Sequence, residues 1–158
     1  MGKKTGPNPT DRAKGGTKRS LLTDAAGVPV GLVIAGANRN DFKLFAATVR
    51  SVPVRRPRPQ PTARQGMCLD KGYDYAEIRR LAARFGFTLH LRTRGEDVRA
   101  RRRRAGGKAR RWVVERTHSW MNRFRRILIR WEKKAENYLA MLHLTCAIIT
   151  SRAAGLLR

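Results

Sequence analysis

Two carboxylates stand in contexts that could support phosphate chemistry. Asp70 ends the short apolar run Gly66–Leu69 and precedes Lys71-Gly72, so we predict a buried strand whose carboxyl end presents an acid. Glu115 lies on the polar face of a helix predicted over 112–133. Carboxylate oxygens are ligands that Mg²⁺ prefers. Two such ions can activate a water and stabilise the leaving oxygen when a phosphodiester is cleaved.

Each carboxylate also has a purely structural interpretation. Asp70 could cap the turn that begins at Lys71. Glu115 could form an ion pair with Arg111, one helical turn earlier, whereas Ser119, one turn later, carries no charge. The residues alone leave both interpretations open.

The charge of the chain predicts a polyanionic partner. Its 158 residues include 36 Lys and Arg but 11 Asp and Glu, which gives a formal charge of +25. Such a charge repels itself, so we expect nucleic acid first and an anionic membrane surface second. The hydrophobic share of 41% exceeds that of a disordered basic tail. The most basic stretch, 92–111, is predicted to be an Arg-rich loop that contacts phosphates, although a solvated surface loop would have the same composition.

The N-terminal half predicts a small β-structure followed by a helix and a connector. Residues 1–18 indicate a basic loop, and two β-rich runs around a polar turn predict a hairpin over 19–35. Asp41 is expected to cap a helix over 42–52. Residues 53–65, rich in Pro and Arg, are expected to form an extended, exposed connector.

The second half predicts a crossover and then long helices. A strand over 66–69, a helix over 76–85 that stops at Gly86, and a strand over 88–91 favour a parallel strand pair. Two helices are predicted within 112–154, the first over 112–133 and the second, apolar almost all round and therefore buried, over 136–153.

Two of the three tryptophans and both cysteines are predicted to lie in the core. Trp120 and Trp131 fall on the apolar stripe of the first long helix, so a core position is favoured over a base-stacking role, while Trp112 lies off that stripe. Cys68 and Cys146 are expected to be reduced core residues. The absence of a secretory signal and the shortness of the longest apolar stretch predict a cytoplasmic protein that does not span a membrane.

Four segments together resemble a known family. They are KKTGPNPTDRAKGGTKRSLLTDAAGVPVGLVIAGANRNDFK, LDKGYD, RRWVVERTHSWMNRFRRILIRWEK and YLAMLHLTCAII. In this order they resemble bacterial insertion-sequence DDE transposases of the IS-five family, within the larger IS-four-like superfamily. The resemblance covers nearly the whole chain, and LDKGYD with RRWVVERTHSW is its most specific part.

The resemblance implies a fold, a metal and roles for individual residues. The implied fold class is α/β, a ribonuclease-H-like mixed sheet flanked by helices. Asp70 matches the second acid of the catalytic triad, Glu115 the third and Arg111 the arginine of the signature around the third acid. The implied cofactor is Mg²⁺ or Mn²⁺, and the implied partner is double-stranded DNA, both element ends and target.

The signature, together with the basic residues already described, gives the expected DNA contacts. It expects a tyrosine where Lys108 stands and a lysine where Asn122 stands, so that Arg123 or Arg126 could supply the donor-strand contact instead. The complete set of expected DNA-binding residues is Lys71, Arg101, Arg102, Arg103, Arg104, Lys108, Arg110, Asn122, Arg123 and Arg126.

One family element has no counterpart here. The family's first aspartate lies on a strand upstream of the GPNPTDR loop, and neither Asp11 nor Asp24 follows an apolar strand of that kind. We therefore expect the sheet to lack its first central strand and the isolated chain to be weakly stable and catalytically inactive. An upstream reading-frame product would supply the missing acid, and the active complex would be a multimer associated with the nucleoid.

Three functions follow as hypotheses. The first is a transposase that cuts DNA and joins 3′ ends to a target. The second is a stand-alone basic DNA-binding regulator, or an inactive remnant of a transposase. The third, a basic RNA-binding protein, is disfavoured because the aromatic-bearing strands typical of single-strand readers are missing.

Overall fold

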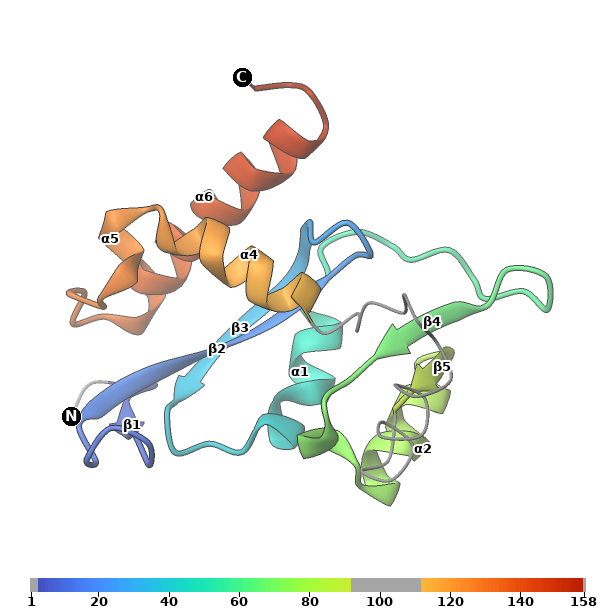
Figure 1. Cartoon of the computed structure of the whole chain (residues 1–158), viewed down its shortest axis with the longest axis horizontal. Coiled ribbons are helices and arrows are strands. Elements are labelled where there is room, and N and C mark those ends of the chain that lie inside the picture. The colour runs from blue at the N-terminus through green and yellow to red at the C-terminus, as the bar shows by residue number, and fades with distance from the viewer. Residues whose placement is uncertain (1–2, 92–111, 158) are drawn as a thin grey trace, which may run out of the picture. The chain divides into compact units, whose positions relative to one another are not determined.

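The computed structural model describes residues 3–91 and 112–157, a mixed α/β structure shown in Figure 1. Contacts divide the chain into two compact units. We call Met1–Pro53 with Val113–Arg158 the hairpin unit, and Val54–Trp112 the crossover unit. Each is described by itself.

The hairpin unit is built on a three-stranded antiparallel sheet. β2 (Gly15–Thr23) pairs with β3 (Pro29–Gly36) where the sequence predicts a hairpin, and β1 (Gly6–Pro7) pairs with the other edge of β2. The loop predicted over 1–18 is therefore wrong in part, because it contains β1 and the start of β2. The paired positions are occupied by glycine and proline. Both residue types are uncommon in strands and show no alternation of apolar and polar side chains, so the sequence pattern did not predict a strand here.

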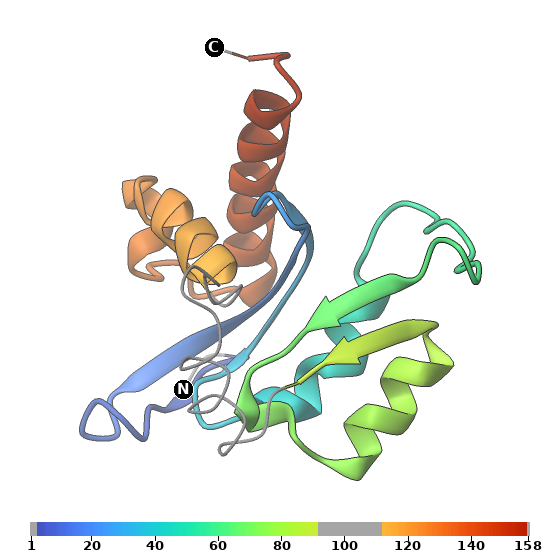
Figure 2. The same ribbon diagram turned by 45° about the vertical axis from the view of Figure 1, so that its right-hand side comes forward.

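The two faces of this sheet serve different helices. Leu21 and Leu32 pair across the strands and pack into the cluster formed with the C-terminal helices. Ser20, on the opposite face, has its hydroxyl 2.7 Å from that of Thr48 in α1 (Phe45–Arg50). Figures 1 and 2 show α1 on one side of the hairpin and α4 to α6 on the other. The period-two alternation of the strands explains this arrangement.

The first helical segment begins differently from the prediction. The 3₁₀ turn η1 (Asp41–Leu44) leads into α1, and the residue at the N-cap is Asn40, whose side chain makes no capping bond. The predicted cap by Asp41 is therefore wrong. Its carboxylate instead lies 3.1 Å from the ammonium of Lys18 on β2.

The first C-terminal helix is shorter than predicted. The helix α4 (Trp112–Asn122) ends at Asn122, and Phe124 has extended backbone angles. A single helical turn, α5 (Arg125–Leu128), follows. The continuous helix predicted over 112–133 is thus wrong beyond Asn122. As a result Trp131 lies outside any helix and is 70% exposed, so its predicted core position is wrong, whereas Trp120 is half-buried against the core.

The second C-terminal helix forms where it was predicted but is not buried all round. α6 (Ala135–Ala153) buries one side, whereas Leu144 on it is 55% exposed. On this face of the hairpin, β3 and the three C-terminal helices contribute the buried residues of one hydrophobic cluster: Leu32, Ile34, Met121, Ile127, Ala135, Tyr138, Leu142 and Ile149.

The crossover unit contains the predicted strand–helix–strand. β4 (Gln65–Cys68) and β5 (Phe87–His90) are parallel, with Met67 opposite Leu89, and α2 (Ala76–Arg84) connects them (Figure 2). Gly86 ends the helix with φ of +76°, a backbone conformation that favours glycine.

The connector before β4 is exposed along nearly all of its length, and one of its arginines contacts both strands. Arg56 donates a hydrogen bond to Gln65 at 2.9 Å, and its guanidinium lies 4.0 Å from the centroid of the Phe87 ring. One side chain thereby attaches the Pro/Arg-rich stretch to both strands.

None of the helices in the described part of the chain is long and apolar enough to cross a membrane.

Candidate functional site

Asp70 lies just beyond the carboxyl end of β4. Its side chain is the N-cap of the 3₁₀ turn η2 (Lys71–Tyr73), where Oδ1 accepts a hydrogen bond from the backbone N–H of Lys71 at 2.7 Å. The capping interpretation of Asp70 is therefore correct. The cap also orients the carboxylate, which is on an exposed residue at the end of a strand.

The strand that leads to Asp70 is only partly buried. Met67 is 5% exposed, but its neighbour Cys68 is an exposed free thiol. The predicted core position of Cys68 is wrong because a strand in a two-stranded sheet turns alternate side chains to solvent. Cys146 on α6 is a half-buried free thiol, and burial raises its pKa to about 11.

Glu115 is exposed in the first turn of α4. A carboxylate near a helix N-terminus interacts favourably with the helix dipole. Thr117, two residues on, is completely buried, and its hydroxyl lies 2.6 Å from the carbonyl oxygen of Gly27. The side of α4 opposite to Glu115 is thus fixed to the turn of the hairpin.

A second contact strengthens this attachment. Arg116 donates a hydrogen bond to the carbonyl of Ala26, and its guanidinium lies 4.9 Å from the centroid of the Trp120 ring. The helix that carries Glu115 is therefore attached to the hairpin turn by two adjacent side chains.

Asp24 organises the turn that receives α4. Its Oδ1 accepts hydrogen bonds from the backbone N–H groups of Ala26 at 2.9 Å and Val28 at 2.8 Å. Gly27 has φ of +86°, and a Cβ there would lie 3.0 Å from the Arg116 guanidinium. Asp24 therefore has a structural role in the turn. The sequence analysis likewise did not identify it with the family's first catalytic aspartate.

Three further polar side chains lie on α4 together with Glu115. Ser119 and Asn122 are exposed, and His118 is half-buried. Burial, and after it the charge of Arg19, lowers the pKa of His118 below its ordinary value of 6.5. The imidazole is therefore neutral at pH 7, and it adds no positive charge beside Glu115.

Arg19 is the main residue that the sequence analysis missed. From β2 it donates to Oδ1 of Asn122 at 3.2 Å, to the hydroxyl of Tyr138 at 3.0 Å and to the carbonyl of Ile127. The available signal was its period-two position, because Arg19 shares a sheet face with Leu21 and must point toward the helices.

The predicted DNA contacts differ in their surroundings. Arg123 is exposed, and Arg126 is 62% exposed with its guanidinium 3.0 Å from Glu132. Asn122 is engaged by Arg19, and Lys71 is half-buried in η2. The other predicted DNA contacts fall within 92–111, outside the part of the chain that the structure describes: Arg101, Arg102, Arg103, Arg104, Lys108 and Arg110. The signature arginine, Arg111, falls there too.

The two candidate acids belong to different units, Asp70 to the crossover unit and Glu115 to the hairpin unit. Within residues 3–91 and 112–157, no group of three or more His, Cys, Asp or Glu side chains could hold a metal ion. The structure therefore gives the local surroundings of each carboxylate and no assembled metal centre.

Comparison with known proteins identifies the family. Residues 2–150 match the profile of the transposase DDE domain. The chain belongs to the DDE transposase family. A protein of Burkholderia cepacia named "Putative transposase for insertion sequence element IS402" is 42% identical over 152 residues, which are 92% of this chain and 68% of that relative. No solved structure matches the chain. DDE transposase domains act on DNA and generally use divalent metal ions.

Proposed function

We propose that this chain is the catalytic part of an IS-five-family transposase with a ribonuclease-H-like fold, in which Asp70 and Glu115 are metal ligands. The observation that carries the proposal is the position of Glu115, exposed on a helix whose other side is fixed through Thr117 and Arg116. A ligand held on a regular element keeps its geometry better than one on a loop. The family match over residues 2–150 supplies the reaction class.

The donor set suits a divalent cation. Asp70 and Glu115 offer carboxylate oxygens, the ligands that Mg²⁺ and Mn²⁺ prefer. The bond from Lys71 N–H to Asp70 Oδ1 fixes one carboxylate oxygen, and Glu115 stands exposed in the first turn of α4. A bound divalent ion would polarise the scissile phosphate and make water a stronger nucleophile.

The protein's own residues then have distinct tasks. Asp70 and Glu115 would hold the metal and would take no proton from the nucleophile. Exposed Arg123 and the basic segment 92–111 neutralise backbone phosphates. In the first step water attacks a phosphodiester at the element end, and the P–O3′ bond breaks to release a 3′-hydroxyl. In the second step that hydroxyl attacks a target phosphodiester, and a target 3′-hydroxyl leaves.

The experiment compares Glu115→Gln and Asp70→Asn with wild type in the transposase made from its native locus with a C-terminal tag. Both variants should lose Mg²⁺-dependent cleavage of a plasmid that carries the element ends, while DNA binding in EDTA is retained. Ser119→Ala, an exposed change on the same helix, is the matched control and should cleave normally. Full cleavage by Glu115→Gln, or loss of binding by a folded Glu115→Gln, would contradict the proposal.

A second candidate function is that of a DNA-binding regulator. It is favoured by the net charge of +25, because electrostatic binding to DNA phosphates needs no metal ion. Its affinity for DNA should fall steeply with salt and be identical with Mg²⁺ and EDTA. The tag also reports the mass of the products of the locus. A longer species would support a transposase that receives its first acid from upstream sequence, and a single species near 17.9 kDa would favour the regulator.

A further inference from the structure

Three large apolar side chains are exposed in the stretch from the last residue of α5 to the start of α6. We call residues 128–134 the Trp131 segment. Trp131 is 70% exposed, Ile129 58% and Leu128 52%. Tryptophan is normally largely buried, and an exposed cluster of large apolar side chains marks an interaction site. The amphipathic pattern predicted Trp131 in the core, so its exposure is a finding of the structure.

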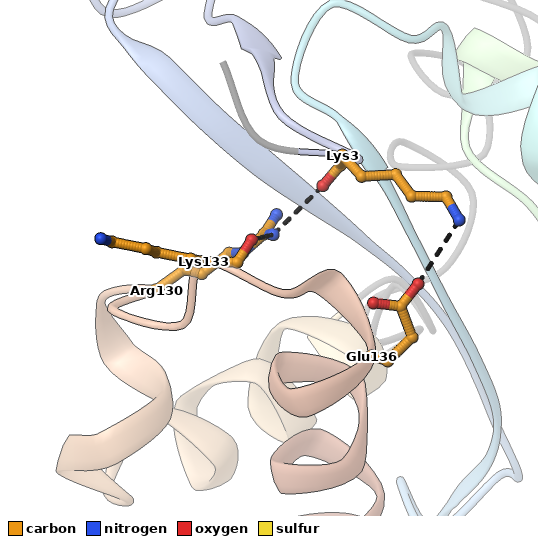
Figure 3. Close-up of polar contacts among 4 residues, drawn as sticks. All are labelled: Lys3, Arg130, Lys133 and Glu136. Carbon is orange, nitrogen blue, oxygen red and sulfur yellow. Dashed lines mark hydrogen bonds and ion pairs between the residues drawn. The ribbon is translucent and has the colours of Figure 1, made fainter.

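The backbone around Trp131 is held in place. Arg130 folds back on its own loop, where Nε donates to the carbonyl of Glu132 at 3.0 Å and Nη2 to that of Lys133 at 3.2 Å. Nη2 also donates to the carbonyl of Lys3 at 3.1 Å, and Lys3 forms an ion pair with Glu136 at 3.5 Å (Figure 3).

The other nitrogen of this guanidinium reaches the sheet. Nη1 donates to the hydroxyls of Thr5 at 3.0 Å and Thr17 at 2.9 Å. The bonds of Arg130 thus connect the loop to the N-terminal strands. Trp131 is therefore presented from an ordered loop, which reduces the entropy lost on binding.

The sequence on both sides of Trp131 is rich in basic residues. The acid at Glu132 has a side chain only 7% exposed, and the Arg126 guanidinium lies 3.0 Å from it. Glu132 therefore offers little negative charge to solvent. Between residues 123 and 134 the basic side chains are Arg123, Arg125, Arg126, Arg130, Lys133 and Lys134, and Glu132 is the acid among them.

We propose that Trp131 stacks on an unpaired base of bound DNA. An indole face accepts any base, and adjacent cations neutralise the phosphates that flank it. A second copy of the chain would bring the same cations against the segment, so charge complementarity favours a polyanion over self-association. The inference rests on the proposed function only in taking DNA as the partner, and it names the part of DNA that this surface contacts.

The test measures binding in EDTA, so that cleavage plays no part. Three DNA probes are compared: a fully paired duplex, the same duplex with unpaired bases at its centre, and a single strand. Trp131→Ala should bind the two unpaired probes about 5- to 150-fold more weakly, which corresponds to the stacking energy of one base, and should bind the paired duplex almost normally. Trp131→Phe should keep most of the affinity because a phenyl ring also stacks.

One control variant and one independent readout accompany these variants. Leu156→Ala removes an apolar side chain that is 77% exposed and lies outside residues 123–134, and it should bind all three probes as wild type does. Tryptophan fluorescence supplies a second readout. Unpaired DNA should quench the wild-type emission more than that of Trp131→Phe, whose remaining emission comes from Trp112 and Trp120.

The contrary results are distinguishable. Unchanged binding by Trp131→Ala, or an equal loss on paired and unpaired probes, would overturn the inference. So would a wild-type dimer that Trp131→Ala converts to a monomer, because the segment would then bind a second copy. If wild type binds no DNA at all, the proposed function fails. If wild type binds and cleaves while Trp131→Ala binds unpaired DNA normally, only this inference fails.

Discussion

Arg19 on β2 donates a hydrogen bond to Oδ1 of Asn122, the last residue of α4, over 3.2 Å. The same guanidinium donates to the Tyr138 hydroxyl on α6 and to the Ile127 carbonyl on α5. One strand residue therefore connects all three C-terminal helices. Together with the Thr117–Gly27 contact, it fixes the helix that carries Glu115 at two separate points.

Asn122→Lys should destabilise the chain, although the family signature expects lysine at this position. A lysine would place a second cation beside Arg19 and remove the acceptor of its hydrogen bond. We expect a loss of about 1–2 kcal/mol in the free energy of unfolding, measured by urea denaturation. Asn122→Ala, which removes only the acceptor, should lose less. Equal stability of Asn122→Lys and wild type would show that the contact with Arg19 contributes nothing.

Thr117→Val should weaken the attachment of α4 to the hairpin turn. The substitution keeps the shape of a completely buried side chain but removes the hydroxyl that contacts the Gly27 carbonyl. A buried carbonyl without its partner costs about 1–3 kcal/mol. Urea denaturation measures the change, and Ser119→Ala on the exposed face should shift stability by less than about 0.5 kcal/mol. A similar small effect for both variants would contradict the anchoring role.

Local signals in the sequence predicted the crossover unit well. Gly66–Leu69, the apolar periodicity of α2 and the stop at Gly86 each depend on a few neighbouring residues. The end of α4 was not predicted, because the apolar spacing continues past Asn122. The bonds that Arg19 makes there join residues more than a hundred positions apart, and no local pattern contains them.

The candidate site divides in the same way. The cap by Asp70 involves the next residue and was among the predicted alternatives. The anchoring of α4 through Gly27 spans 90 positions, and the exposure of Trp131 depends on where the preceding helices end. Whether Asp70 and Glu115 share a metal stays a prediction, because the two lie in different units.

The two cysteines should differ in reactivity toward a thiol reagent such as a maleimide. Burial raises the pKa of Cys146 to about 11, so at pH 8 nearly all of it is the unreactive thiol. Cys68 is exposed and should be labelled rapidly. Mass spectrometry after brief labelling should show one adduct, on the peptide that contains Cys68, and two adducts in urea. Rapid labelling of Cys146 in the folded chain would contradict its burial.

His118 should make stability depend on pH in a defined window. Burial, and after it the charge of Arg19, lowers its pKa in the folded chain, whereas in the unfolded chain it titrates near 6.5. Between the folded pKa and 6.5 the unfolded state holds more protons, so the free energy of unfolding must fall as pH decreases through this range. Urea midpoints measured in a pH series should show this slope.

His118→Gln should flatten that slope, while His143→Gln, at an exposed position on α6, should leave it unchanged. Glu136 acts in a separate and more acidic window. A backbone hydrogen bond, and after it Lys3, lowers the pKa of Glu136, so its contribution is lost only as pH falls below its ordinary value of 4.5. A slope just below pH 6.5 that survives in His118→Gln would therefore mean that another group, and not the histidine beside Arg19, binds the proton.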